Sequence, residues 1–175
     1  PSVFMTLCGP SVPFNLASLI KPFRGGGPGM GTISILGQNW RPFQRLTFVT
    51  PAFAEYASGH STFSACGAQV LSRFTLRNDL YDPNVRLPWD RDGDGQGDDL
   101  GEFRVRPGSL TIEPGLPKKE VVLRWDTLQQ AADEAGLSRR LGGIHFQDGD
   151  LRARVVGTRV ADIALDKATR LFNGH

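Results

Sequence analysis

Cysteine and long apolar runs are both scarce in this sequence of 175 residues, and each shortage excludes a class of protein. Two cysteines, Cys8 and Cys66, are too few for a disulfide framework or a cysteine-rich zinc site, and they leave the cellular compartment open. No stretch reaches the roughly 18 consecutive apolar residues of a membrane-spanning helix, so we expect no membrane span. Hydrophobic residues still make up 39% of the chain, which is typical of one globular domain with a buried core.

Basic residues are not concentrated in any one run, and histidine is rare. The 20 Lys and Arg residues against 18 Asp and Glu residues give a net charge of +2, and the basic residues are scattered along the chain. This distribution does not indicate nucleic-acid binding. Of the three histidines, His60 and His145 lie in short strings that contain other anion-binding residue types, and the third is the terminal His175.

Helical periodicity begins after a weakly patterned first third. Proline and the string RGGGPGMG interrupt residues 1–50, where we expect at most short helices around Ala17 and near Trp40. Apolar residues then recur at helical spacing over residues 58–77, which are predicted to form a helix. Residues 82–125 follow as an insert, in which a polar loop precedes two alternating, β-branched segments that predict a β-ribbon.

Two more helices are expected after the insert. Asp126 and Gln129 resemble a capping box and Gly136 a C-terminal stop, so they bound the first of these helices. The second is expected over about residues 150–172. We therefore predict one mainly α-helical domain over residues 1–175, with a short β-ribbon insert.

A Ser-Gly-His step lies directly before the first predicted helix, in the string EYASGHSTFSACGAQVL. Backbone N–H groups at a helix N-terminus have no partner within the helix, and the helix dipole favours negative charge there, so an oxyanion is the expected ligand. Ser58 adds a hydroxyl, Gly59 allows close approach of the backbone, and His60 can move protons near neutral pH. The alternative is an N-cap serine beside an incidental surface histidine.

Two further strings add cationic and imidazole groups. NWRPF contributes Arg41, and LSRRLGGIHF contributes Arg139 and His145 across a double glycine. Arginine binds phosphate-like oxygens through two parallel hydrogen bonds and keeps its charge at physiological pH. Together with the Ser-Gly-His step, these groups suit a tetrahedral oxyanion.

In this order, the motifs WRP, SGHS and SRRLGGIH resemble the three-part signature shared by vanadium-dependent haloperoxidases and type-2 phosphatidic acid phosphatases. The wider context, PAFAEYASGHSTFSA and AADEAGLSRRLGGIHF, resembles the bacterial haloperoxidase-like branch. The resemblance covers residues 39–172 and implies a helical bundle of the vanadium haloperoxidase and acid phosphatase type. Because catalytic domains of this family are much longer, it also implies that this chain is the C-terminal part of a larger helical domain, completed by an N-terminal segment or a second subunit.

The resemblance also implies a vanadate cofactor and assigns a role to each motif residue. His145 would bond directly to vanadium, or attack phosphorus in a phosphatase, and His60 would be the acid–base residue. The equatorial oxygens would be held by Arg41, Arg139, Ser58 and the Gly59 amide. Phe53 takes the position near the halide site, with a core aromatic as the equal alternative.

One cation of the family pattern is missing. The lysine expected about seven residues before Arg41 is replaced by Ser34. Lys21 or Arg24 could fold back to take its place, or Arg45 could substitute for it. Otherwise the oxyanion is held more weakly, or this member has lost activity.

The aspartate expected four residues after His145 is also missing, because position 149 is Gly. Either neighbouring acid, Asp148 or Asp150, could orient His145. Either acid could instead be the N-cap of the last helix, and for Asp150 we prefer the N-cap role.

The leading function is a vanadate-dependent haloperoxidase, which uses hydrogen peroxide to oxidise a halide to hypohalous acid. An acid phosphatase that hydrolyses a phosphate ester with His145 as nucleophile is the enzymatic alternative. A non-catalytic, oxyanion-binding relative is the third possibility, and the missing lysine keeps it open.

The string DRDGDGQGDDLGE, residues 90–102, matches the first part of a calcium-loop pattern, with Gly95 at the sharp turn. The predicted ligands are Asp90, Asp92, Asp94, Asp98 and the Gln96 carbonyl. The twelfth position is Gly101, so Asp99 and Glu102 are the nearest candidates for a bidentate ligand. We predict a structural calcium ion remote from the chemistry, the alternative being a solvated acidic loop.

Overall fold

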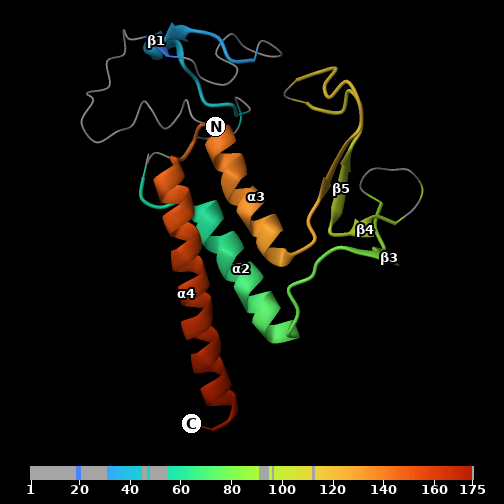
Figure 1. The fold of residues 1–175 in the computed structure, drawn as a ribbon, viewed down its shortest axis with the longest axis vertical. Helices are drawn as coiled ribbons and strands as arrows, with labels where there is room; N and C mark the ends of the chain where they lie inside the picture. The colour runs from blue at the N-terminus through green and yellow to red at the C-terminus, as the bar shows by residue number, and fades with distance from the viewer. Residues whose placement is uncertain are drawn as a thin grey trace.

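Three α-helices dominate the part of the chain that this computed structural model describes, which is residues 19–20, 31–44, 47, 55–90, 95, 97–111 and 113–174. They are α2 (Gly59–Thr75), α3 (Leu128–Leu141) and α4 (Gln147–Phe172). Figure 1 shows them packed side by side, with α4 extending beyond the other two toward the C-terminus. The predicted fold class, mainly helical with small strands, is confirmed.

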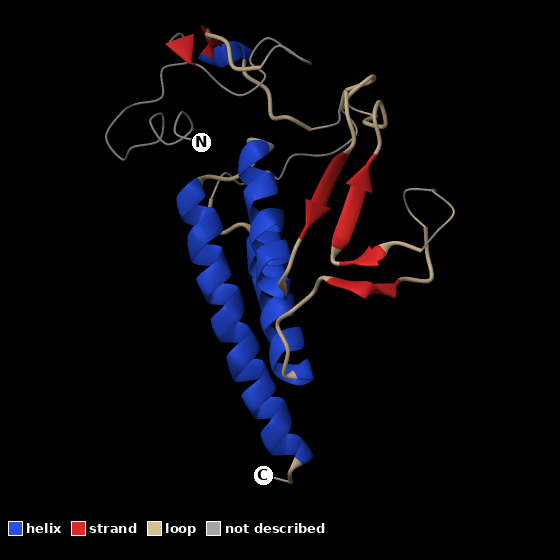
Figure 2. Ribbon diagram, turned by 45° about the vertical axis from the view of Figure 1, so that its right-hand side comes forward, coloured by secondary structure: helices blue, strands red, loops and turns tan. Residues whose placement is uncertain are grey.

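The described strands form three separate two-stranded antiparallel sheets. β1 (Leu19–Ile20) pairs with β2 (Ile35–Leu36). The short 3-10 helix η1 (Gly37–Asn39) comes next and ends just before Trp40. In the insert, β3 (Asp82–Arg86) pairs with β4 (Asp99–Leu100), and β5 (Glu102–Val105) pairs with β6 (Val121–Arg124). Figure 2 shows these last two sheets on one side of the helices. The expected helix near Ala17 falls outside the described residues.

Small residues allow α2 and α4 to approach closely. The buried positions on α2 are Ser61, Ala65 and Ala68, and those on the facing stretch of α4 include Ala153, Gly157 and Ala161. A Cβ atom on Gly157 would overlap the backbone carbonyl oxygen of Thr62. This contact sets the distance between α2 and α4. None of the described helices has the length and apolarity needed to cross a membrane.

The boundaries of α3 differ from the predicted ones at both ends. The capping box is formed by Thr127 and Gln130, one residue later than the predicted pair, because Thr127 is still extended and forms a β-bridge with Asp79. Gly136 does not end the helix. It lies buried within α3, where a Cβ atom would overlap the Asp150 carboxylate, and the helix continues to Leu141.

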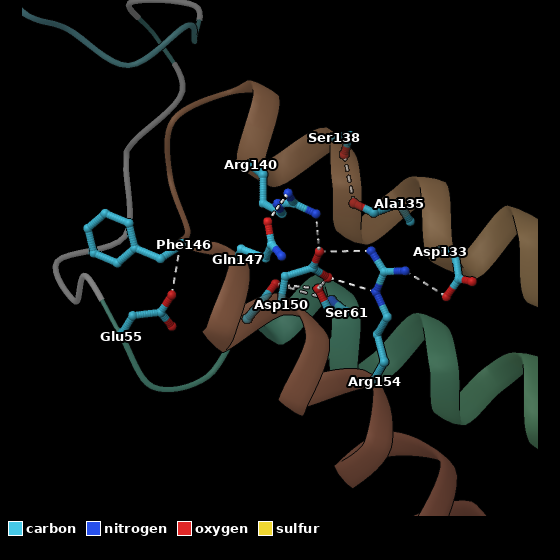
Figure 3. Close-up of polar contacts among 11 residues, drawn as sticks. Glu55, Ser61, Asp133, Ala135, Ser138, Arg140, Phe146, Gln147, Asp150 and Arg154 are labelled. Carbon is cyan, nitrogen blue, oxygen red and sulfur yellow. Dashed lines mark hydrogen bonds and ion pairs between the residues drawn. The ribbon is translucent and has the colours of Figure 1, made fainter. Parts of the chain in front are cut away.

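The predicted N-cap role of Asp150 is also wrong. Helix α4 begins at Gln147, so Asp150 lies inside the helix, and its side chain is fully buried. The N-cap residue is Phe146, whose side chain cannot accept a hydrogen bond. The Phe146 N–H instead donates to Oε1 of Glu55 at 2.8 Å, so a carboxylate from a distant segment takes the place of the side-chain cap (Figure 3).

Candidate oxyanion site

Three segments meet at one end of the helical bundle. The N-terminus of α2 lies against the first turn of α4, where the Ser58 N–H donates to the Gly149 carbonyl at 3.4 Å. The segment after η1 docks on the end of α3, where the Phe43 N–H donates to the Gly142 carbonyl at 2.9 Å. The three strings that the sequence singled out are therefore brought together, although they span about a hundred residues of the chain.

The Ser-Gly-His step forms the N-terminus of α2, as predicted. Ser58 is the N-cap, with its Oγ accepting from the Ser61 N–H at 3.3 Å, and its side chain is fully buried. Gly59 and His60 are the first two residues of the helix. A Cβ atom on Gly59 would meet no other atom within 4 Å, so the backbone is accessible at this point.

Arg139 and His145 lie at the opposite side of the site, on the end of α3 and the turn that follows it. Gly143 has a φ of 69°, which lets the chain reverse, and the Ile144 N–H closes the turn by donating to the Arg139 carbonyl at 3.0 Å. The two side chains are buried, with exposed fractions of 8% for Arg139 and 4% for His145. Burial lowers the pKa of the Arg139 guanidinium.

The electrostatics connect His60 to this buried pair. Desolvation is the largest cause that lowers the pKa of His60, and electrostatic interactions with Arg139 and His145 lower it further. His60 itself is exposed at the start of α2, whereas Arg139 and His145 are buried. The lowered pKa favours the neutral form of the His60 imidazole.

Other predicted residues lie elsewhere. Arg41 is exposed, and its guanidinium donates to the carbonyl oxygens of Gln38 at 3.1 Å and Trp40 at 2.7 Å, so in this structure it is held by its own segment. Ser34, at the family lysine position, is also exposed. Four predicted residues fall outside the described part of the chain: Phe53, Lys21, Arg24 and Arg45.

The two acids after His145 have different environments. Asp148 is exposed, receives a hydrogen bond from the Tyr56 hydroxyl and pairs with Arg152 at 2.7 Å. Asp150 is buried and accepts from Ser61 Oγ at 2.7 Å and from two guanidinium nitrogens of Arg154, each at 2.8 Å (Figure 3).

The model of the VCPO second helical-bundle domain matches residues 18–174, which is nearly the whole chain. The chain belongs to this family. Two solved structures are similar to it: an apo-type bacterial vanadium-dependent chloroperoxidase, with a TM-score of 0.66, and a holo-type one, with a TM-score of 0.65. In each case the identity is 24% and the match covers 88% of this chain, which spans only 28% of the chloroperoxidase chain. No curated protein matches the chain.

Several residues around the site were missed by sequence reasoning. Glu55 caps α4, while Ser61 and Arg154 surround the buried Asp150 carboxylate. The spacing of Asp150 and Arg154, four residues apart, is typical of an ion pair on a helix. That this pair is buried, and that Ser61 reaches it, depends on how α2 packs on α4 and leaves no local signal.

The calcium-loop prediction is only partly within the described residues. Gly95 has a φ of 87°, as the sharp turn requires, and its N–H donates to Asp90 Oδ2 at 2.9 Å. Asp99 pairs with Arg86 at 2.7 Å and Glu102 with Arg104 at 2.6 Å, so both candidates for the bidentate ligand are engaged by arginine. Within the described residues no acidic cluster is placed to hold a metal, but three predicted ligands fall outside them: Asp92, Asp94 and Gln96.

Proposed function

We propose that the chain carries the oxyanion site of a vanadium-dependent haloperoxidase, which uses hydrogen peroxide to oxidise a halide to hypohalous acid. One observation carries this proposal: the start of α2, with Ser58 and Gly59, lies against the first turn of α4, and Arg139 and His145 are buried on the end of α3 and the turn that leads to α4. A buried guanidinium and a helix N-terminus both favour a bound anion.

The donor set fits vanadate. His145 would bind the vanadium atom, while Arg139, Ser58 and the Gly59 amide would hold its oxygens. Arg41 would join them only if its guanidinium left the carbonyl oxygens of Gln38 and Trp40. When bound, vanadate would supply the Lewis acid that activates hydrogen peroxide.

We assign the movement of the proton to His60. Its lowered pKa favours the neutral imidazole, which would accept a proton from a ligand held between Ser58 and Arg139. Protonated His60 would then return this proton to a departing oxygen. The positive charge of the neighbouring groups favours proton release from His60.

A halogenation assay tests this function. Purified protein is given hydrogen peroxide with bromide, iodide or chloride, with and without vanadate, and the vanadate-free protein is assayed in parallel for hydrolysis of a phosphate ester. We expect halogenation that requires vanadate. Phosphate-ester hydrolysis without vanadate-dependent halogenation would instead favour the acid phosphatase, and the absence of both activities despite oxyanion binding would favour the non-catalytic relative.

A further inference from the structure

Glu55 extends from the segment that leads into α2 to the backbone next to His145. Its Oε1 accepts from the Phe146 N–H at 2.8 Å (Figure 3). This N–H belongs to the planar peptide group that joins His145 to Phe146, so the bond restricts the main chain on the C-terminal side of His145. On the N-terminal side, the Ile144 N–H donates to the Arg139 carbonyl at 3.0 Å. The backbone of His145 is therefore held on both sides, and a distant segment supplies one of the two bonds.

Gly149 leaves the space that the Glu55 carboxyl group occupies. The three atoms that a Cβ atom on Gly149 would meet most closely all belong to this carboxyl group, and it would overlap all three. A side chain at position 149 and the carboxyl group of Glu55 therefore exclude each other. The same segment makes a second contact with this turn, where the Ser58 N–H donates to the Gly149 carbonyl at 3.4 Å. Residues 55–58 are thus held against the first turn of α4 at two points.

Helix capping alone does not account for the placement of Glu55. Its Oε2 is buried, and it has no hydrogen-bond partner within the described part of the chain. A buried acceptor without a partner lowers the stability of the fold. Helix α3 begins without this cost, because the hydroxyl of Thr127 caps it locally by accepting from the Gln130 N–H at 3.1 Å. A side chain placed at a cost to stability is typical of a functional site.

We propose that Glu55 is a positioning residue for His145, because its bond to the His145–Phe146 peptide fixes the direction in which the His145 imidazole leaves the main chain. Glu55 acts through the backbone and does not contact the ligand. The short segment 55–58 then couples the start of α2 to His145. The inference rests on the proposed function, in which His145 is the residue that binds vanadium.

Vanadate affinity and the NMR resonances of the His145 imidazole provide the test. Vanadate binding is measured by calorimetry in the wild type, in Glu55→Ala, in Glu55→Gln and in the control Thr127→Ala. The control also removes a helix cap, but at the end of α3 that is remote from Arg139. The imidazole resonances are recorded without vanadate, so they report the environment of His145 independently of binding.

The variants should differ in both readouts. Glu55→Ala should weaken vanadate binding at least about tenfold and shift the His145 resonances, because a misplaced group loses much of its interaction with a bound ligand. Glu55→Gln keeps an oxygen acceptor on a side chain of the same length, so it should retain the wild-type affinity. Thr127→Ala should lower the melting temperature and leave the affinity and the resonances unchanged.

Gly149→Ala is the reciprocal variant. Its methyl group should displace the Glu55 carboxyl group and weaken vanadate binding as Glu55→Ala does. In the Glu55→Ala background the carboxyl group is gone, so the same substitution should change the affinity little. Equal effects of Gly149→Ala in the two backgrounds would contradict the inference, because they would show that the two side chains do not compete for one space.

The outcomes separate this inference from the proposed function. Wild-type protein that binds no vanadate overturns both. Wild-type protein that binds vanadate, with neither the affinity nor the His145 resonances changed in Glu55→Ala, overturns the inference alone. The same holds if Thr127→Ala weakens binding as much as Glu55→Ala, because loss of a cap would then be sufficient. If Glu55→Ala does not melt cooperatively, the retained affinity of Glu55→Gln and the lost affinity of Gly149→Ala decide.

Discussion

No carboxylate is among the residues assigned to the proposed site, which include Arg139 and two histidines. Arg139 and His145 are buried, and electrostatic interactions with them lower the pKa of His60 after the effect of desolvation. An anion placed among these groups would reverse this effect, because a nearby opposite charge favours the protonated imidazole. This electrostatic setting supports the proposal of a negative ligand.

The pKa of His60 tests this electrostatic account. NMR titration of the imidazole should give a value below the ordinary 6.5, so that His60 gains its charge only at more acidic pH than a free histidine. Arg139→Gln should raise the value by removing one of the charges that lower it, and bound phosphate should raise it as well. As a control, Arg152→Gln, which alters the exposed pair with Asp148, should leave it unchanged. A wild-type pKa at or above 6.5 would contradict the arrangement.

The residues of the site differ in how far the sequence could reveal them. Ser58, His60 and His145 are found from local strings, because a capping residue and a double-glycine turn have their own patterns. Glu55 and the buried Asp150 cluster depend on which segments pack together after folding. For the same reason, the sequence identified Arg41 but could not predict that the guanidinium is held by its own segment.

At the scale of the elements, the contact between α2 and α4 holds the start of α2 against the first turn of α4, where the Ser58 N–H donates to the Gly149 carbonyl. Ser58 belongs to the start of α2, and His145 directly precedes the residues that begin α4. Helix periodicity predicted both helices, but the pattern of buried small residues that brings them together was not recognised. The start of α3 predicted from local patterns was one residue too early, because the β-bridge that keeps Thr127 extended is a tertiary contact.

Two glycine substitutions measure this helix contact. Gly157→Ala should lower the free energy of unfolding by about 1–3 kcal/mol, because the new methyl group overlaps the Thr62 backbone, which cannot move like a side chain. Gly67→Ala is the matched control, since its Cβ would meet nothing within 4 Å, and it should stabilise α2 by about 0.5–1 kcal/mol. Urea unfolding gives both values. Equal effects of the two substitutions would show that the close approach of α2 and α4 does not constrain the fold.

The loop of residues 90–98 remains a predicted calcium site. Terbium, which replaces calcium on oxygen ligands, should show luminescence excited through Trp89, the exposed residue next to Asp90. Calcium should displace it, and a chelator should lower the melting temperature of calcium-loaded protein. Asp90→Asn should weaken the signal, whereas Asp126→Asn, an exposed acid outside the loop, should not. A melting temperature that changes with neither calcium nor the chelator would contradict a structural calcium site.

At the scale of the whole molecule, large apolar side chains remain exposed on the helices. Phe63 and Phe74, which lie on one side of α2, are 81% and 79% exposed, and Ile163 on α4 is 69% exposed. The chain spans 28% of the chloroperoxidase chains that it matches, and its family is described as a second helical-bundle domain. We propose that another helical unit, from an N-terminal segment or a second subunit, covers these faces.

This proposal predicts the behaviour of residues 1–175 prepared alone. They should self-associate or bind a hydrophobic dye, because the exposed phenylalanine side chains are buried when an apolar partner binds. Replacing Phe63 and Phe74 with Ser should reduce both effects, whereas Thr75→Ser at the end of the same helix should not. Light scattering after size-exclusion chromatography measures the association. A monomer that binds no dye would contradict the need for a covering unit.

Vanadate binding by His145→Ala is the measurement that tests the central claim most directly. We expect wild-type protein to bind vanadate tightly. His145→Ala should lose this binding, because the only proposed bond from protein to vanadium is gone. His60→Ala should still bind vanadate but turn over more slowly. Thermal melting of each variant shows that the fold is retained. Equal vanadate affinity in the wild type and in folded His145→Ala would contradict the assignment of the site.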